Sequence, residues 1–230
     1  MAESTVKRVP GRGRFISFEG GEGAGKSTQI KLLAEKLAGA KVRTIVTREP
    51  GGSPGAEIIR HLVLSGVGKL LGPEAETLLF AAARDDHVHT VIEPALKQGI
   101  WVLCDRFSDS TRVYQGILGK VSPAILSAMQ RVTIGDLKPD LTVILDVPVE
   151  VGLRRAAERR GAGAADRFEA EGIKFHRELR DAYRRIAAAE PQRCLLIDAT
   201  AEPDMVAANI WSALRHRFLA SEIGTVASSA

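Results

Sequence analysis

Eight consecutive residues near the start of the chain have the types and spacing of a phosphate-binding loop (P-loop). Residues 20–27 read GGEGAGKS and match the pattern G-x-x-x-x-G-K-[ST]. Glycines allow successive backbone N–H groups to converge on phosphate oxygens, and a following helix adds its positive N-terminal end. Lys26 is expected to reach the β- and γ-phosphates, while the Ser27 hydroxyl holds Mg²⁺. The predicted nucleoside triphosphate site consists of Gly20, Gly21, Glu22, Gly23, Ala24, Gly25, Lys26, Ser27 and Thr28.

The position of this motif favours a functional loop over a chance glycine-rich turn. A short apolar run at residues 15–18 precedes it, and a helical pattern over residues 26–37 follows it. The tetrapeptide Asn-Lys-x-Asp, which reads guanine in GTPases, does not occur in the sequence. Motor and transport ATPases are usually larger. The sequence therefore favours a small phosphotransferase, which also needs a metal carboxylate, an acceptor-phosphate site and mobile cations.

An acidic and a basic residue follow the apolar run at residues 101–104. Asp105 stands at the carboxyl end of this predicted strand, where it can hold Mg²⁺ through water, and Arg106 offers a planar fork that matches a phosphate. The plain alternative is an exposed ion pair at a strand end. Asp146, at the end of another predicted strand, is a competing metal carboxylate. The adjacent arginine favours Asp105, so Ser27 and Asp105 are the predicted metal ligands.

Apolar patterning predicts the scaffold that positions these residues. Short runs rich in Val, Ile and Leu alternate with helical patterns, and continuous apolar runs are typical of parallel strands buried on both faces. We therefore predict an α/β fold, a doubly wound five-stranded parallel sheet flanked by helices, with ligands beyond the carboxyl ends of its strands. The predicted strands are residues 15–18, 42–47, 101–104, 141–146 and 194–198, and the predicted helices are residues 26–37, 55–64, 74–98, 123–134, 149–160, 174–189 and 203–219.

Composition and length agree with one soluble domain. The chain has 230 residues, of which 45% are hydrophobic and 26% charged, and its net charge is +4. We expect residues 14–219 to form a single domain between flexible tails at residues 1–13 and 220–230. No apolar stretch is long enough to span a membrane, no secretory signal is recognisable, and two cysteines are too few for a disulfide framework. These features predict a cytoplasmic protein without membrane contact.

Further motifs, in a fixed order along the chain, resemble the bacterial thymidylate kinase family. TREPGG at residues 47–52 is followed by DRF at 105–107 and STRVYQG at 110–116. FAAAR at 80–84, DRFE at 166–169 and IDAT at 197–200 are also similar to that family. The resemblance implies a P-loop kinase fold and an enzyme that transfers the γ-phosphoryl group of ATP to dTMP, with Mg²⁺, giving dTDP and ADP in dTTP biosynthesis. It also implies a homodimer.

The resemblance assigns roles on the acceptor side of the site. Phe80 would stack on the thymine ring, and Arg84 would donate to a pyrimidine carbonyl. Residues at i and i+4 share a helix face, which suits a common site, although a core phenylalanine beside a solvated arginine has the same spacing. The other residues implied are Arg106 and Arg48 for the dTMP phosphate, Thr111 and Gln115 for the base, Tyr114 for the sugar, and Glu22 for the 3′-hydroxyl and phosphate region.

Members of this family carry the catalytic arginine either in the P-loop or in a lid. Gly23 and Ala24 occupy the P-loop here, so the resemblance implies a lid, which we predict at about residues 154–168 with a glycine-containing tip at 161–163. A run of arginines on a helix is also typical of a solvated face. The predicted catalytic residues are Lys26, Glu22, Arg106, Arg155 and Arg159, of which the last two share a helix face at i and i+4.

Two other protein classes are compatible with a P-loop. A deoxynucleoside kinase needs a general base near a sugar hydroxyl, whereas Arg106 with Arg48 favours a phosphate acceptor. A nucleic-acid-binding ATPase needs a contiguous basic face with aromatic side chains. The excess basic residues instead lie in three separate segments, residues 1–14, 154–167 and 174–185. The sequence therefore predicts ATP and dTMP as partners and no nucleic acid.

Overall fold

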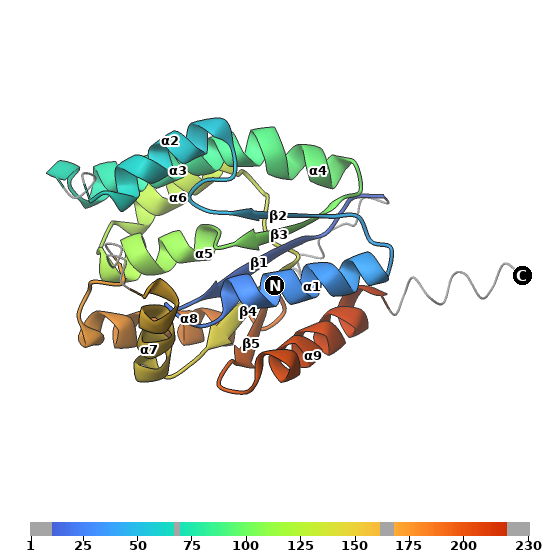
Figure 1. Cartoon of the computed structure of the whole chain (residues 1–230). Helices are drawn as coiled ribbons and strands as arrows, with labels where there is room; N and C mark the ends of the chain where they lie inside the picture. Colours follow the sequence, from blue (N-terminus) through green and yellow to red (C-terminus); the bar gives the residue numbers. More distant parts are fainter. Residues whose placement is uncertain (1–10, 67–69, 162–167, 220–230) are drawn as a thin grey trace, which may run out of the picture.

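The computed structural model describes residues 11–66, 70–161 and 168–219 of the chain (Figure 1). Most of the two predicted tails and most of the predicted lid tip lie outside these ranges. None of the helices within the described ranges is long and apolar enough to cross a membrane.

Five parallel strands form the centre of the protein in the order β2-β3-β1-β4-β5. The predicted five-stranded parallel α/β sheet is confirmed. β1 pairs with β3 so that Phe18 lies opposite Asp105, and the P-loop therefore leaves β1 beside the carboxyl end of β3. The strands are β1 Phe15–Gly20, β2 Thr44–Arg48, β3 Trp101–Asp105, β4 Leu141–Asp146 and β5 Cys194–Asp198.

Alternating side chains of the strands build a separate core on each face of the sheet. Ile16 and Phe18 of β1 belong to a buried cluster that includes Leu33 of helix α1 (Lys26–Gly39). Phe15, one residue before Ile16, belongs to a second cluster on the opposite face. Because successive strand residues point to opposite faces, Glu19 shares the face of Phe15, away from α1.

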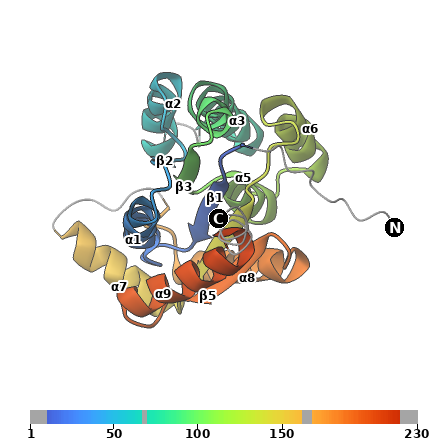
Figure 2. The same cartoon turned by 90° about the vertical axis from the view of Figure 1, so that its right-hand side faces the viewer.

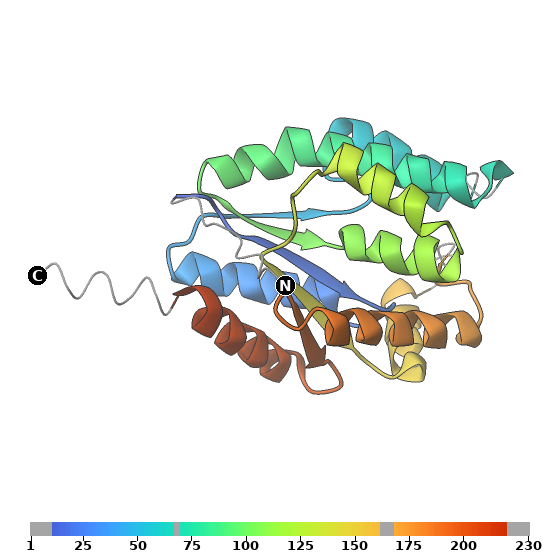
Figure 3. The same cartoon turned by 180° about the vertical axis from the view of Figure 1, so that it is seen from behind.

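Helices cover both faces of this sheet. α1 and α9 pack together on one face, whereas η2, α4 and α8 cover the other, and α2, α3 and α6 lie side by side (Figures 2 and 3). The remaining α-helices are α2 Pro54–Leu64, α3 Pro73–His87, α4 Glu93–Lys97, α5 Ser108–Thr111, α6 Pro123–Thr133, α7 Val149–Arg160, α8 Ile173–Ala189 and α9 Pro203–Leu214, and the π-helical segments are η2 Val88–Ile92, η3 Arg112–Leu118 and η4 Arg215–Leu219.

One helical segment has no counterpart in the predicted pattern. Residues 108–118 form α5 and η3, although the segment opens on Ser, Asp and Thr and its apolar repeat is confined to Val113, Tyr114, Ile117 and Leu118. Asp109 of this segment is buried and pairs with Arg193 at 2.7 Å, across more than eighty residues of sequence. This tertiary ion pair and the packing of Val113, Tyr114 and Leu118 against α8 together hold the segment in place.

The predicted helix over residues 74–98 is also divided in the structure. α3 ends at His87, η2 follows directly, and α4 completes the segment. The three parts follow one another without a break in the helical backbone. The sequence pattern consequently predicts one continuous helix here.

Candidate active site

A cleft of about 390 Å³ opens at the carboxyl edge of the sheet, where the P-loop, the end of β3, α3, η3 and α7 meet. Most of the predicted nucleotide-binding residues line this cleft. Gly20 and Gly21 instead border a much smaller cavity of about 20 Å³ on the other side of the loop. The predicted residues that line the main cleft are Glu22, Gly23, Ala24, Gly25, Lys26, Ser27, Arg48, Phe80, Arg84, Asp105, Arg106, Thr111, Tyr114, Gln115 and Arg159.

The P-loop lysine is folded back onto the loop that carries it. Lys26 Nζ donates to the carbonyl oxygens of Gly20, at 3.2 Å, and Gly21, at 3.0 Å. Burial and the nearby Arg106 lower the pKa of Lys26. Gly23 and Gly25 have positive φ values of 64° and 91°, which a glycine adopts without steric cost. The loop thus has the backbone needed to point N–H groups at phosphates.

Ser27 and Asp105 form a pair of oxygen ligands suited to a hard cation. The Ser27 hydroxyl donates to Asp105 Oδ2 at 3.0 Å, and both side chains line the cleft. Mg²⁺ is commonly bound by one or two protein oxygens together with waters and phosphate oxygens. The competing carboxylate of Asp146 instead accepts two hydrogen bonds from Arg180, at 2.6 and 2.8 Å. The geometry therefore favours Asp105 over Asp146 as the metal carboxylate.

Arg106 connects the end of β3 to the P-loop. One Nη2–H donates to Glu22 Oε1 at 2.6 Å, and the guanidinium lies 5.3 Å from the centre of the Tyr114 ring. Burial would raise the pKa of Glu22, but the charges of Arg106 and Lys26 lower it below its ordinary value. Glu22 is therefore ionised, and an incoming phosphate would compete with it for Arg106.

Arg84 is a buried member of a hydrogen-bonded network rather than a solvated side chain. Its Nε donates to Glu49 Oε2 at 2.7 Å, and Nη2 donates to Thr111 Oγ1 at 3.0 Å. The other Glu49 oxygen lies 3.2 Å from His87 Nδ1, and His87 Nε2 lies 2.7 Å from Thr47 Oγ1. Glu49 is absent from the predicted site residues, although it stands inside the TREPGG motif. The hydrogen bond from Arg84 to Glu49 orients the Arg84 side chain at the cleft.

The other acceptor-side residues surround the same space. Phe80 and Arg84 lie one turn apart on α3, and both are buried at the cleft. Gln115 Nε2 donates to Glu76 Oε1 at 3.4 Å. Arg48 is half-exposed and pairs with Glu57 at 3.1 Å at the cleft mouth. Phe80 and Arg84 of α3 thus line the same cleft as the polar side chains of η3.

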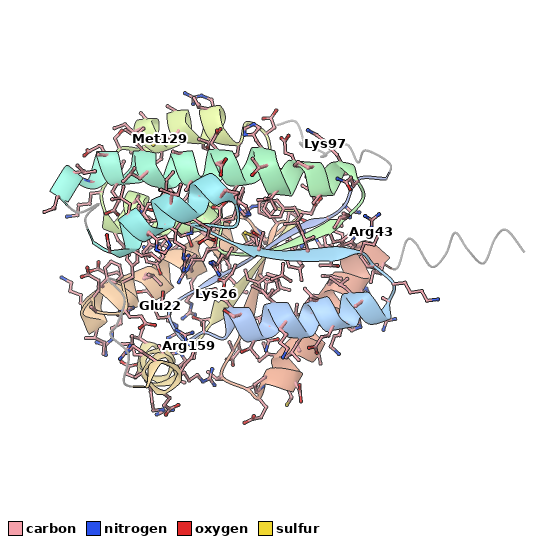
Figure 4. The ribbon with its side chains drawn as sticks, turned by 45° about the horizontal axis from the view of Figure 1, so that its top comes forward. Glu22, Lys26, Arg43, Lys97, Met129 and Arg159 are labelled. Carbon is pink, nitrogen blue, oxygen red and sulfur yellow. The ribbon has the colours of Figure 1, made fainter. Side chains whose placement is uncertain are left out.

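The two predicted lid arginines point in different directions. Arg159, near the end of α7, lines the cleft close to Glu22 and Lys26 (Figure 4). Its Nη2 also donates to Glu169 at 3.0 Å. Arg155 instead donates to the carbonyl oxygens of Ala199, at 2.8 Å, and of residue 200. The structure does not bring Arg155 to the cleft, because its guanidinium is hydrogen-bonded to carbonyl groups after β5.

Backbone contact between the P-loop and α7 leaves no room for a side chain. A Cβ atom on Gly23 would lie 1.9 Å from the carbonyl oxygen of Gly152, and a Cβ on Gly152 would lie 2.5 Å from that of Glu22. Both distances are far below van der Waals contact. Helix α7 is therefore seated directly on the phosphate-binding loop.

A P-loop, a serine–aspartate pair and a largely buried arginine held at the loop by Glu22 lie in one cleft of a parallel α/β sheet. Together these parts define a P-loop phosphotransferase.

Comparison with known proteins identifies the family. The family model for thymidylate kinase matches residues 18–210, and the chain belongs to the thymidylate kinase family. It is 75% identical over 230 residues to the thymidylate kinase of Nitrobacter winogradskyi, covering 100% of both chains, and 74% identical over 226 residues to that of Bradyrhizobium diazoefficiens, covering 98% and 99%. The crystal structure of thymidylate kinase from Ehrlichia chaffeensis is similar, with a TM-score of 0.70, 32% identity and coverage of 88% and 99%. The chain is thus a nucleoside monophosphate kinase that phosphorylates dTMP with ATP in dTTP synthesis.

The contact between the P-loop and α7 gives a first prediction. Gly152→Ala forces the two backbones apart, and we expect the KM for ATP to rise about tenfold, the effect of roughly 1.4 kcal/mol of overpacking. Gly172→Ala is the matched control, because a Cβ there has no neighbour within 4 Å and φ is −70°. Steady-state kinetics measure both variants. An unchanged KM for ATP in Gly152→Ala would contradict the tight seating of α7.

Proposed function

We propose that this cleft transfers the γ-phosphoryl group of ATP to the phosphate of dTMP by binding the two nucleotides end to end. The observation that carries the proposal is the position of Arg106, which lines the same cleft as Lys26 and is held at the P-loop by Glu22. In this arrangement the donor phosphates occupy the P-loop and the acceptor phosphate lies at Arg106. In-line transfer needs this juxtaposition of donor and acceptor.

On the donor side, backbone N–H groups of the P-loop bind the ATP phosphates. Lys26 exchanges its two carbonyl partners for the β- and γ-phosphate oxygens. Ser27 and Asp105 are the residues that would hold Mg²⁺, which neutralises phosphate charge when it is bound. Their oxygen donors and their position beside the loop support this assignment.

On the acceptor side, we propose that dTMP occupies the part of the cleft between α3 and η3. Phe80 stacks on the thymine ring, and Arg84, already oriented by Glu49, donates to a thymine carbonyl. The other roles follow the family resemblance: Thr111 and Gln115 for the base, Tyr114 for the sugar, Glu22 for the 3′-hydroxyl and phosphate region, and Arg48 with Arg106 for the phosphate.

Arg106 distinguishes a monophosphate acceptor from a nucleoside acceptor. We expect Arg106→Ala to raise the KM for dTMP at least about tenfold, since a hydrogen bond to a charged group contributes roughly 1.5–3 kcal/mol, while the KM for ATP stays nearly unchanged. Steady-state assays with dTMP and with thymidine test both points. Activity on thymidine without activity on dTMP would refute the proposal and favour a deoxynucleoside kinase.

We further propose that Arg159 is the arginine that neutralises the transferring phosphoryl group. It is the lid arginine that lines the cleft within the described residues, and its charge contributes to the lowered pKa of Glu22. Arg155, the other predicted catalytic arginine, then braces α7 against the segment after β5.

The two arginines should therefore differ in kinetics. Arg159→Ala is expected to lower kcat by about a hundredfold or more, the scale of a lost transition-state cation, with little change in thermal stability. Arg155→Ala should lower thermal stability and leave most of kcat intact. Single-turnover kinetics and thermal melts separate the two effects. The reverse ranking of kcat values would assign the phosphoryl contact to Arg155.

The outer layer of α2, α3 and α6 supports a homodimer. Ile58, Leu78 and Val132 on these three helices are 73%, 55% and 80% exposed, which is costly for large apolar side chains gathered on one layer. We propose that a second copy of the chain packs against this layer. The two free, buried cysteines agree with a reducing compartment, and we propose that the dimer acts in the cytoplasm.

The dimer can be tested by sedimentation. We expect the native chain to sediment as a dimer and Val132→Glu to shift it towards monomer, because a buried charge at an interface is strongly unfavourable. Met205→Glu is the control, since Met205 is 63% exposed on α9, away from this layer. A native chain that sediments as a monomer would contradict the proposal.

A further inference from the structure

A buried carboxylate at the end of β1 collects hydrogen bonds from the segment that carries Arg106. Glu19 is fully buried. Its Oε1 accepts from the backbone N–H groups of Phe107, at 2.8 Å, and Ser110, at 3.3 Å. Its Oε2 accepts from the hydroxyl of Ser110, at 2.7 Å, and from that of Tyr183, at 2.9 Å. Three of these four donor groups belong to the four residues that follow Arg106.

The turn at Arg106 needs such an anchor. Arg106 has a φ of 69°, in the left-handed region that a residue with a Cβ adopts only at a cost of about 1–2 kcal/mol. β1 holds the turn on both sides of this residue: the Arg106 N–H donates to the Phe18 carbonyl at 2.9 Å, and the next N–H donates to Glu19. The end of β1 also holds the side chain, because Arg106 Nη1 donates to the Gly20 carbonyl at 3.3 Å.

We propose that Glu19 is a positioning residue that fixes the turn from which Arg106 reaches the acceptor phosphate. This inference rests on the proposed role of Arg106 in binding the dTMP phosphate. Glu19 acts through the backbone of the turn, and its own oxygens are occupied by four donors. It is therefore assigned no contact with either nucleotide.

The surroundings of Glu19 make its charge sensitive to pH. Burial, and then the charge of Asp109, raise the pKa of Glu19 to about 7, while Arg106 and the hydrogen bonds from Ser110 and Phe107 oppose the rise. The ionised form accepts four charge-assisted bonds, which are stronger than neutral ones. The titratable and charged groups that face Glu19 are Asp109 of α5, Arg106, Tyr114 of η3, Tyr183 of α8, Lys26 of α1 and Cys104 of β3.

Glu19→Ala tests the positioning role through the kinetics of each substrate. We expect the KM for dTMP to rise about tenfold or more and the KM for ATP to change less than about twofold, because the lost bonds orient only the acceptor cation. Asp140→Ala is the matched control. Asp140 is a carboxylate at the opposite end of β1 that accepts from the Phe15 N–H at 2.8 Å and pairs with Arg14 at 3.4 Å. This control should lower thermal stability with a native KM for dTMP.

Glu19→Gln keeps the test valid if the alanine variant fails to fold. Its amide oxygen can accept from the Phe107 N–H, and its amide nitrogen can donate to the Tyr183 hydroxyl, which turns to accept. We expect the KM for dTMP to stay within about threefold of the native value. The native kcat/KM for dTMP should rise through about pH 7 as the carboxylate ionises, and the glutamine variant should lack this step. The phosphate of dTMP titrates equally in both assays and cancels in the ratio of native to variant kcat/KM, so a ratio that does not change between about pH 6 and 8 overturns the proposal.

A double variant separates this inference from the proposed function. If Glu19 acts through Arg106, Glu19→Ala adds less than about twofold to the KM for dTMP of Arg106→Ala, because coupled residues are not additive. Additive effects, or equal losses for ATP and dTMP, would show a merely structural role for Glu19 and leave the proposed function standing. A native KM for dTMP in Arg106→Ala alone would overturn the proposed function itself.

Discussion

The ion pair between Arg106 and Glu22 is the interaction on which the geometry of the cleft depends. It joins the carboxyl end of β3 to the P-loop across 2.6 Å, in a place where both side chains are largely buried. β1 and β3 are neighbours in the sheet, so the residues that follow them meet at one edge. Arg106, which we propose as the cation for the acceptor phosphate, is consequently held in place by the protein itself. A preorganised charge stabilises developing charge without further reorganisation.

Other buried carboxylates hold the surrounding loops in place in a similar way. Glu49 orients Arg84, Asp109 pairs with Arg193, and Glu19 accepts from the segment after Arg106. Segments beyond a strand end have lost the hydrogen bonds of the sheet ladder and need other partners. Breaking a buried charge pair costs about 3–5 kcal/mol, so Glu49 and Asp109 strongly oppose movement of the segments that they hold, and Glu19 adds hydrogen bonds to the backbone of a third segment. The cleft is thus lined by fixed groups, although it is built from loops and helix ends.

Some of these features could be predicted from sequence, and others could not. The P-loop and the alternation of strands and helices follow from local patterns, and the structure confirms the predicted sheet. The segment at residues 108–118 has only a short apolar repeat, and its polar first turn is held through Asp109 by Arg193, which is distant in the sequence. Glu19 and Glu49 look like ordinary charged residues at strand ends. The one available signal for Glu19 is its place in a largely apolar strand, where an unpaired carboxylate would be costly.

By itself, the sequence determined the phosphate-binding chemistry and the order of the elements, because glycine spacing and apolar periodicity act on neighbouring residues. Only the tertiary structure decided which of several equivalent side chains face the cleft. Arg180 donates to Asp146, whereas Asp105 accepts from Ser27. Arg155 donates to a carbonyl group after β5 and so does not line the cleft. These choices depend on partners that are tens of residues distant in the chain. No local sequence pattern predicts such partners, since they come into contact only when the sheet has formed.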